Sequence, residues 1–213
     1  MHAPMDAPAP ETLACRLDGY TDLPPGKLAN VVTYLEMRAP PPQRRAVPRP
    51  DLSLVATDTR LAPYRALFRR IGAPWLWMGR LALCDAALEA TLRDPRLVSR
   101  TLVRAGEAIG LVELFFDGGE AEIAYCGVVP EAIGTGAGRF LMDAAVAQAF
   151  ARPIARLTVH TCTFDHPGAV AFYQRSGFTA TKRAVEIHDD PRLAGMLPRD
   201  ARVDAWPVID PSA

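Results

Sequence analysis

The chain carries no excess of charge of either sign, because its 213 residues include 24 Lys and Arg and 24 Asp and Glu. A neutral chain lacks the broad positive field of proteins that bind nucleic acids without sequence preference. It also lacks a polybasic patch for an anionic membrane surface. We therefore expect neither nucleic acid nor a membrane as a partner, and any anion that the protein binds must be held by a local site.

Long hydrophobic runs are also absent. The apolar run IAYCGVVP over 123–130 falls well short of the ~20 residues of a transmembrane helix. The first ten residues have neither the basic start nor the apolar segment of a secretory signal. No two cysteines form a C-x-x-C pair, which favours free thiols in a reducing, cytoplasmic setting. The cysteines are Cys15, Cys84, Cys126 and Cys162.

Proline is in excess, with 20 in total and ten of them within residues 1–50. The Pro/Ala-rich stretch 1–27 predicts an N-terminal arm, and the proline cluster over 39–50 predicts a stiff loop, because proline fixes φ and lacks an amide donor. The length fits one principal domain, which we expect over 28–190. Residues 191–213 again contain prolines and are expected to form a tail.

Hydrophobic periodicity predicts one domain that mixes helices and strands, of the α/β or α+β class. Pro63 and Pro167 fit first helical positions, and Asp85 fits an N-cap. A glycine turn after Asp117 predicts a hairpin within three consecutive antiparallel strands. The expected strands cover 30–37, 97–104, 108–116, 121–129, 155–162 and 178–187, and the expected helices cover 63–72, 84–94, 139–151 and 167–176.

The loop IGTGAGR over 133–139 lies between an expected strand and an expected helix. Glycines allow a ligand to approach the backbone, and the first turn of a helix offers unpaired N–H groups to an anion. Arg139 stands where a dinucleotide-binding loop needs its last glycine, and the lysine of a nucleotide-triphosphate loop is absent. The loop therefore predicts a phosphate cradle of another kind, in which Arg139 can also pair with a phosphate. The alternative is a glycine-rich turn with no ligand.

Two segments together resemble the GCN5-related N-acetyltransferase (GNAT) superfamily. They are VVPEAIGTGAGRFLMDAA over 128–145 and AVAFYQRSGF over 169–178. Gly136 and Gly138 match the paired glycines of that family, and Tyr173 matches its tyrosine, whereas Ile133 stands where the family has Gln or Arg. The order and spacing agree over roughly 97–187.

This resemblance implies a single domain with a mixed, mostly antiparallel sheet, flanked by helices, whose strands splay at the cofactor site. It implies acetyl-CoA as the cofactor, with its pantetheine arm paired to the backbone near Cys126 and Val128. His166 stands where the family often has an asparagine that touches the cofactor, and an imidazole can also donate a hydrogen bond. The loop residues implied for the pyrophosphate are Ile133, Gly134, Thr135, Gly136, Ala137, Gly138 and Arg139.

Acetyl transfer to an amine needs a neutral nitrogen. Deprotonating an alkylamine of pKa ~10.4 at neutral pH costs about 3.4 pH units, or roughly 4.6 kcal/mol. A positioned base contributes ~10²–10⁴-fold, which is large enough to matter. Glu122 is the candidate base, because alternation along a strand puts it on one face with Cys126 and Val128. Glu120 is expected on the same face of the strand and is the second candidate for the base. The alternative for both residues is an ordinary carboxylate that faces solvent on the strand.

Tyr173 is the candidate general acid, since a phenol of pKa ~10 can hand its proton to the leaving thiolate. The alternative for Tyr173 is a core aromatic residue on a helix. The backbone N–H near Val128 is expected to polarise the thioester carbonyl, as in an oxyanion hole.

A second cluster, formed by His160, Cys162, Asp165 and His166, allows other interpretations. A metal site needs three or four convergent ligands, and these residues do not all share one strand face. A Cys–His nucleophile pair is a further alternative to ordinary residues beside a cofactor cleft. Trp75, Trp77 and Met78 form a third group, which predicts either core packing or a wall of the acceptor pocket.

The sequence therefore favours an acetyl-CoA-dependent N-acetyltransferase that acts on a primary amine of a small molecule or a protein. One alternative is a catalytically silent module that binds acyl-CoA and regulates a partner. Another is a hydrolase that uses Cys162 and needs no amine.

Overall fold

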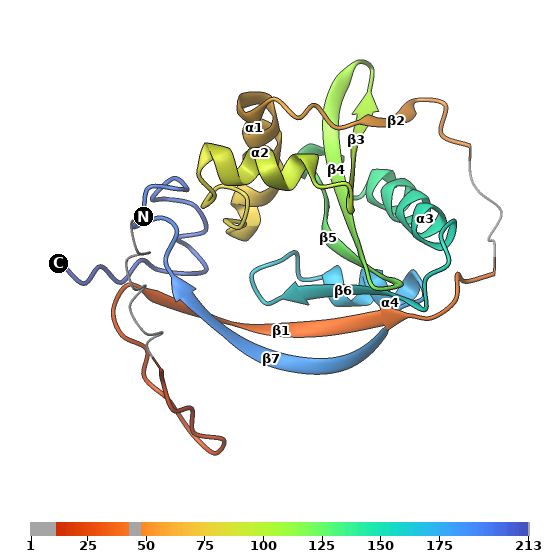
Figure 1. Cartoon of the computed structure of the whole chain (residues 1–213). Helices are drawn as coiled ribbons and strands as arrows, with labels where there is room; N and C mark the ends of the chain where they lie inside the picture. The colour runs from red at the N-terminus through yellow and green to blue at the C-terminus, as the bar shows by residue number, and fades with distance from the viewer. Residues whose placement is uncertain (1–11, 43–47, 213) are drawn as a thin grey trace, which may run out of the picture.

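The structure is a computed structural model that describes residues 12–42 and 48–212, and it holds one seven-stranded sheet with helices on both faces (Figure 1). The strands are β1 (Lys27–Met37), β2 (Leu52–Ala56), β3 (Leu97–Arg104), β4 (Glu107–Asp117), β5 (Glu120–Val128), β6 (Arg156–Cys162) and β7 (Thr179–Asp189). The helices are α1 (Leu61–Gly72), α2 (Asp85–Arg93), α3 (Ala137–Phe150) and α4 (Ala169–Arg175), with short 3-10 segments η1 (Ala73–Trp75) and η2 (Pro130–Ala132). The order across the sheet is β2-β3-β4-β5-β6-β1-β7.

Neighbouring strands of this sheet are antiparallel except for β5 and β6, which are parallel. The parallel pairing joins Glu120–Ile123 to Arg156–Val159 and goes no further. β5 stays paired with β4 as far as Val128, while β6 stays paired with β1 as far as Cys162. The two strands therefore part in their second halves, which confirms the mixed, mostly antiparallel sheet with splayed strands that the resemblance implied.

Helices α1 and α3 cover opposite faces of the sheet at β4, where every residue from Ile109 to Leu114 is buried. In α1 the buried residues Tyr64, Phe68 and Ile71 recur at helical spacing. Each such side chain contributes roughly 1.5–3 kcal/mol when it is fully buried, so these contacts hold the helix to the sheet. The buried side of α3 comprises Leu141, Met142, Ala145, Val146 and Ala149.

The element boundaries differ from the expected ones in several places. Strand β2 lies in a segment for which no strand was predicted, because it is a short edge strand preceded by prolines that pairs with β3 alone. Pro63 is the third residue of α1, and α4 begins two residues after Pro167. Asp85 is the first residue of α2 rather than its N-cap, and the cap position is Cys84.

Residues 190–212 fold back onto the end of the sheet. The Arg192 guanidinium is buried and donates to the Asp190 carboxylate and to the carbonyl oxygens of Ala201 and Trp206. Leu197 joins a small core with Leu28, Leu76 and Phe164. Part of the predicted tail is thus packed against residues of β1 and η1.

Parts of the predicted arm and of the proline-rich loop, 1–11 and 43–47, lie outside the described residues. Within 12–42 and 48–212, no helix has both the length and the apolar character needed to cross a membrane.

Candidate active site

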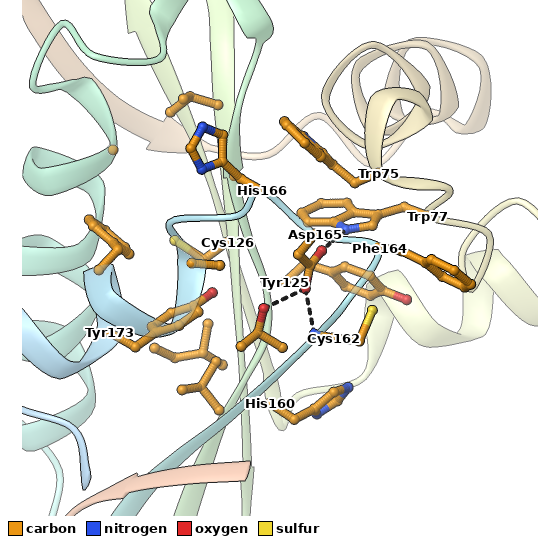
Figure 2. A pocket seen from close by; sticks show the side chains of 18 of the residues that line it. Trp75, Trp77, Tyr125, Cys126, His160, Cys162, Phe164, Asp165, His166 and Tyr173 are labelled. Carbon is orange, nitrogen blue, oxygen red and sulfur yellow. Dashed lines mark hydrogen bonds between the residues drawn. The ribbon is translucent and has the colours of Figure 1, made fainter. Parts of the chain in front are cut away.

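A cavity of about 630 Å³ opens where β5 and β6 part (Figure 2). Its lining residues come from two groups of elements, and we name the two parts of the lining after them. The first arm is the part lined by the glycine loop and Tyr173, and the second arm is the part lined by Trp77, Phe164 and Asn30. Of the residues predicted for the site, those that line the cavity are Cys126, Val128, Ile133, Gly134, Gly136, Gly138, Arg139, His166 and Tyr173.

Three residues predicted for the site do not line the cavity: Thr135, Ala137 and Glu122. The first two belong to the glycine loop and the start of α3. The hydroxyl of Thr135 donates to the carbonyl oxygen of Ala132 at 2.8 Å and closes the loop. The methyl group of Ala137 is buried at the first position of α3. Both residues therefore shape the backbone of the loop rather than present a side chain to a ligand.

The glycine loop has the backbone conformation of an anion cradle. Gly134 and Gly136 have φ of 78° and 84°, a region that favours glycine, and Gly136 is the N-cap of α3. The first N–H that donates within the helix is that of Phe140, which bonds to the Gly136 carbonyl oxygen. The preceding N–H groups of the first turn are thus available to an anion. A Cβ at Gly134 or Gly138 would meet nothing within 4 Å, so open space lies beside the loop for the phosphates of coenzyme A.

Arg49 is a residue of this loop site that the sequence analysis missed. Its Nη1 donates to the Thr135 carbonyl oxygen at 3.0 Å, and its guanidinium pairs with the Asp51 carboxylate in a bidentate bond. Arg49 thus braces the loop from the segment before β2. No local signal marked this arginine, since it lies 86 positions from Thr135 in the chain.

A β-bulge in β5 overturns the predicted alignment of Glu122 with the cofactor strand. Glu113 of β4 pairs with Tyr125, but the next β4 residue pairs with Ile123, so Ala124 is an extra residue. The bulge inverts the alternation of side chains along the strand. Glu122 therefore shares a face with Tyr125, whereas Cys126 points to the opposite face.

Tyr173 projects from α4 into the first arm and is 8% exposed (Figure 2). Burial raises the pKa of its phenol well above the usual 10.0, and the Cys126 thiol adds to the same direction. The phenol therefore stays protonated at neutral pH. Burial also raises the pKa of the Cys126 thiol to about 12, which keeps that sulfur protonated.

His160 and Glu122 form a pair on the second face of the sheet. His160 Nδ1 lies 3.3 Å from Glu122 Oε1, and His160 lines the cavity. The hydrogen bond raises the pKa of His160 above its usual 6.5 and lowers that of Glu122 below 4.5. The negative charges of Glu186 and Asp165 raise the pKa of His160 further.

The other ring and charge neighbours of His160 come from β1 and β7. Tyr34 contacts the imidazole with ring centroids 5.6 Å apart, and Lys182 lies over the Tyr34 ring. Glu120, the second candidate for the base, is instead paired with Arg156 at 2.8 Å and does not line the cavity.

The Asp165 carboxylate joins the segment that carries Trp77 to the end of β6 by hydrogen bonds. One carboxylate oxygen accepts from Trp77 Nε1 at 2.9 Å, and the other accepts from the Thr161 hydroxyl and the Cys162 backbone N–H (Figure 2). A Cβ at Gly127 would meet the Trp77 ring at 2.9 Å, so this glycine lets the indole reach β5. Trp77 thus both packs and lines the cavity, which joins the two interpretations offered for it.

The same segment is fixed at its other end by a buried ion pair. Arg80 donates to the fully buried Glu113 carboxylate at 2.8 Å and lies over the Tyr125 ring. Tyr64 donates its hydroxyl to Glu113 at 2.7 Å, which satisfies the second oxygen. The segment between Trp75 and Arg80 is therefore anchored to β4 through Glu113 and to the loop after β6 through Asp165.

The His160, Cys162, Asp165 and His166 cluster does not converge on one point. The His166 ring packs against Trp75 and accepts from the Gly168 N–H through Nδ1. Burial raises the pKa of Cys162 to about 11, which makes its sulfur a weak nucleophile at neutral pH. Over the part of the chain that the structure describes, no three His, Cys, Asp or Glu side chains are grouped to hold a metal ion.

Comparisons with known proteins agree with this geometry. Residues 65–178 match the acetyltransferase (GNAT) family, whereas no curated protein matches the sequence. A GCN5-related N-acetyltransferase from Sphaerobacter thermophilus has a TM-score of 0.58 and 15% identity, with 76% of this chain and 52% of that chain covered.

Two further solved structures have the same fold. A putative GNAT-family acetyltransferase from Novosphingobium aromaticivorans gives a TM-score of 0.56 at 16% identity, covering 79% of this chain and 70% of that one. The ribosomal-protein-S18-alanine N-acetyltransferase of Escherichia coli has a TM-score of 0.51 and 15% identity, with 65% of this chain and 94% of that chain covered. This chain thus spans about half the length of the Sphaerobacter protein. At these identities the structures establish the fold, and the match over more than half of the sequence shows that the chain belongs to the GNAT acetyltransferase family.

Proposed function

We propose that this protein is an acetyl-CoA-dependent N-acetyltransferase that acetylates a primary amine by direct attack on the thioester. The observation that supports this most is that three kinds of group open into one cavity: free N–H donors at the start of α3, a protonated phenol and an imidazole. Phosphate binding, proton donation and proton removal are the tasks that such a transfer needs. The cytoplasmic setting stays a prediction of the cysteine pattern.

Coenzyme A fits the residues that are present. The N–H groups of Ala137, Gly138 and Arg139 are those of the first helical turn, and they would hold the pyrophosphate with Arg49 bracing the loop. Cys126 and Val128 lie on the part of β5 that β6 has left, so backbone groups there are open to a pantetheine arm. When bound, acetyl-CoA supplies a thioester carbon that bonds to the amine nitrogen as its C–S bond breaks.

His160 is the better base in the proposed mechanism, with Glu122 as its positioning residue. His160 lines the cavity, whereas Glu122 does not. A base works best when its pKa is near the operating pH, which suits a histidine of raised pKa more than a carboxylate of lowered pKa. His160 would take the proton of the attacking amine, directly or through water, and release it to solvent.

Tyr173 is the proposed acid. Its phenolic proton would pass to the sulfur of the leaving coenzyme, and the phenolate would regain a proton before the next cycle. Burial keeps the phenol protonated, so its proton is available when the thiolate of the departing coenzyme forms beside it.

The test combines titration calorimetry with acetyl-CoA and a thiol-release assay over a panel of amines. We expect binding and amine-dependent release in the wild type. A His160→Gln variant should bind acetyl-CoA normally and lose about 10²–10⁴-fold in turnover. The matched control is Glu89→Gln on α2, a half-exposed residue outside the cavity, which should keep both properties. Binding without release for every amine class would instead identify a silent acyl-CoA-binding module.

A further inference from the structure

Asn30 and Glu186 form an acceptor pair in the lining of the second arm. Both line the cavity, and Asn30 Nδ2 donates to Glu186 Oε2 at 2.9 Å. Asn30 is only 3% exposed, yet its Oδ1 has no hydrogen-bond partner among the described residues. A buried acceptor without a partner is costly, which indicates that a ligand group donates to it.

The acceptor pair is negative. Across 12–42 and 48–212, Glu186 forms no ion pair with an Arg or Lys side chain, and Asn30 is its hydrogen-bond partner. The charged side chains of the first arm are instead Arg139 and Arg175, next to the glycine loop and α4. His188, the neighbouring titratable group on β7, contacts the Asp189 carbonyl oxygen and packs its ring against Phe164. The acceptor pair is therefore suited to a cation.

The acceptor pair and His160 lie at separate positions along β1. On β1, Tyr34 pairs with His160, and Asn30 lies four residues away, which is about 13 Å along a strand at ~3.3 Å per residue. The lining of the same cavity includes the aromatic residues Trp77, Tyr125 and Phe164. Aromatic walls accept an alkyl chain, and their faces also attract a cation.

We propose that the amine acceptor is a linear dication, an α,ω-diamine or a longer polyamine, whose distal ammonium binds Glu186 and Asn30 while the other nitrogen reacts beside His160. This inference rests on the proposed acetyl transfer and names its substrate class. The distal ammonium would donate to the Glu186 carboxylate and to Asn30 Oδ1. Its alkyl chain would lie along the aromatic wall.

The test is a set of acceptors of equal length that differ only at the far end: hexanediamine, aminohexanol, hexylamine and aminohexanoate. In the wild type, kcat/KM should be about tenfold higher for the diamine than for hexylamine, and lowest for aminohexanoate. Glu186→Gln should lower the diamine-to-hexylamine ratio by about tenfold, and Glu186→Lys should reverse the order in favour of aminohexanoate. Glu89→Gln removes the same charge far from the cavity and should leave the ratio unchanged.

Equal kcat/KM for hexanediamine and hexylamine in the wild type would overturn the dication proposal while leaving the acetyltransferase intact. If no amine is acetylated, the proposed function fails first. Calorimetric titration of the protein with hexanediamine then decides the ammonium site without turnover. If hexanediamine binds and Glu186→Gln weakens this binding, the ammonium site is supported. If hexanediamine does not bind, or binds equally well to the Glu186→Gln variant, the site is refuted.

Discussion

Replacing Gly136 by alanine tests whether the glycine loop must keep its present conformation to hold a coenzyme. Gly136 has φ of 84° at the N-cap of α3. An L-residue in this region costs roughly 1–2 kcal/mol. A Cβ there would also meet Nη1 of Arg49 at 3.0 Å, so the arginine that braces the loop must move. The substitution therefore strains the loop without touching the core.

The cost of this strain appears in one of two measurements. If the loop keeps its shape, the free protein loses stability and the affinity for acetyl-CoA is unchanged. If the loop relaxes, the free protein keeps its stability and the affinity falls. In both cases the free energy of unfolding of the acetyl-CoA-saturated protein falls by about 1–2 kcal/mol, which is roughly 2–8 °C in Tm for a chain of this size.

Thermal unfolding with saturating acetyl-CoA, together with calorimetry, gives both quantities. The matched control is Gly106→Ala in the turn between β3 and β4, where φ is 82° and a Cβ would meet nothing within 4 Å. It should lose similar stability with no loss of affinity. A Gly136→Ala protein with wild-type affinity and wild-type Tm in the saturated state would show that no ligand depends on this loop conformation.

Three further outcomes follow from the site. Tyr173→Phe should lower kcat about 10²–10⁴-fold and leave the Kd for acetyl-CoA nearly unchanged, and wild-type turnover in the thiol-release assay would remove this phenol from the mechanism. Because His160 must be neutral to accept a proton, kcat/KM should rise with pH through its pKa. Glu122→Gln removes the hydrogen bond that raises this pKa, so the acid limb of the pH profile should move to lower pH, and an unmoved limb would contradict the pairing. Arg49→Gln should weaken acetyl-CoA binding about three- to tenfold in calorimetry, because the bond to Thr135 that braces the loop is lost, whereas unchanged affinity would show that the loop needs no brace.

The main elements of the fold could be predicted because their signals are local. Periodicity located β3, β4, β5, α3 and β6 close to their observed positions, and a glycine turn marked the hairpin between β4 and β5. Strand β2 was missed because it is five residues long and gains its stability from pairing with β3. The packing of residues 190–212 was equally hidden, since it depends on the burial of Arg192 and on contacts with β1 and η1.

The site could be predicted in part for the same reason. The glycine loop and Tyr173 belong to contiguous motifs, so their places follow from the chain itself. Glu122 was aligned with Cys126 by strict alternation, and one bulged residue was enough to put the two on opposite faces. Asn30 and Glu186 lie 156 positions apart, and only the pairing of β1 with β7 brings them together.

Although the net charge of the chain is zero, the lining of the cavity contains charged side chains of both signs, in different parts. Arg139 and Arg175 lie with the helix start that would hold an anionic coenzyme, while Asp165 and Glu186 lie on the side proposed for the acceptor. Coulomb interactions between such groups and their ligands are strong inside a cavity and are screened beyond about 10 Å in salt solution. Each part can therefore select a ligand of opposite charge without a field over the whole surface. The neutral reacting nitrogen is needed only at His160, so binding of a cation and removal of a proton are assigned to different residues.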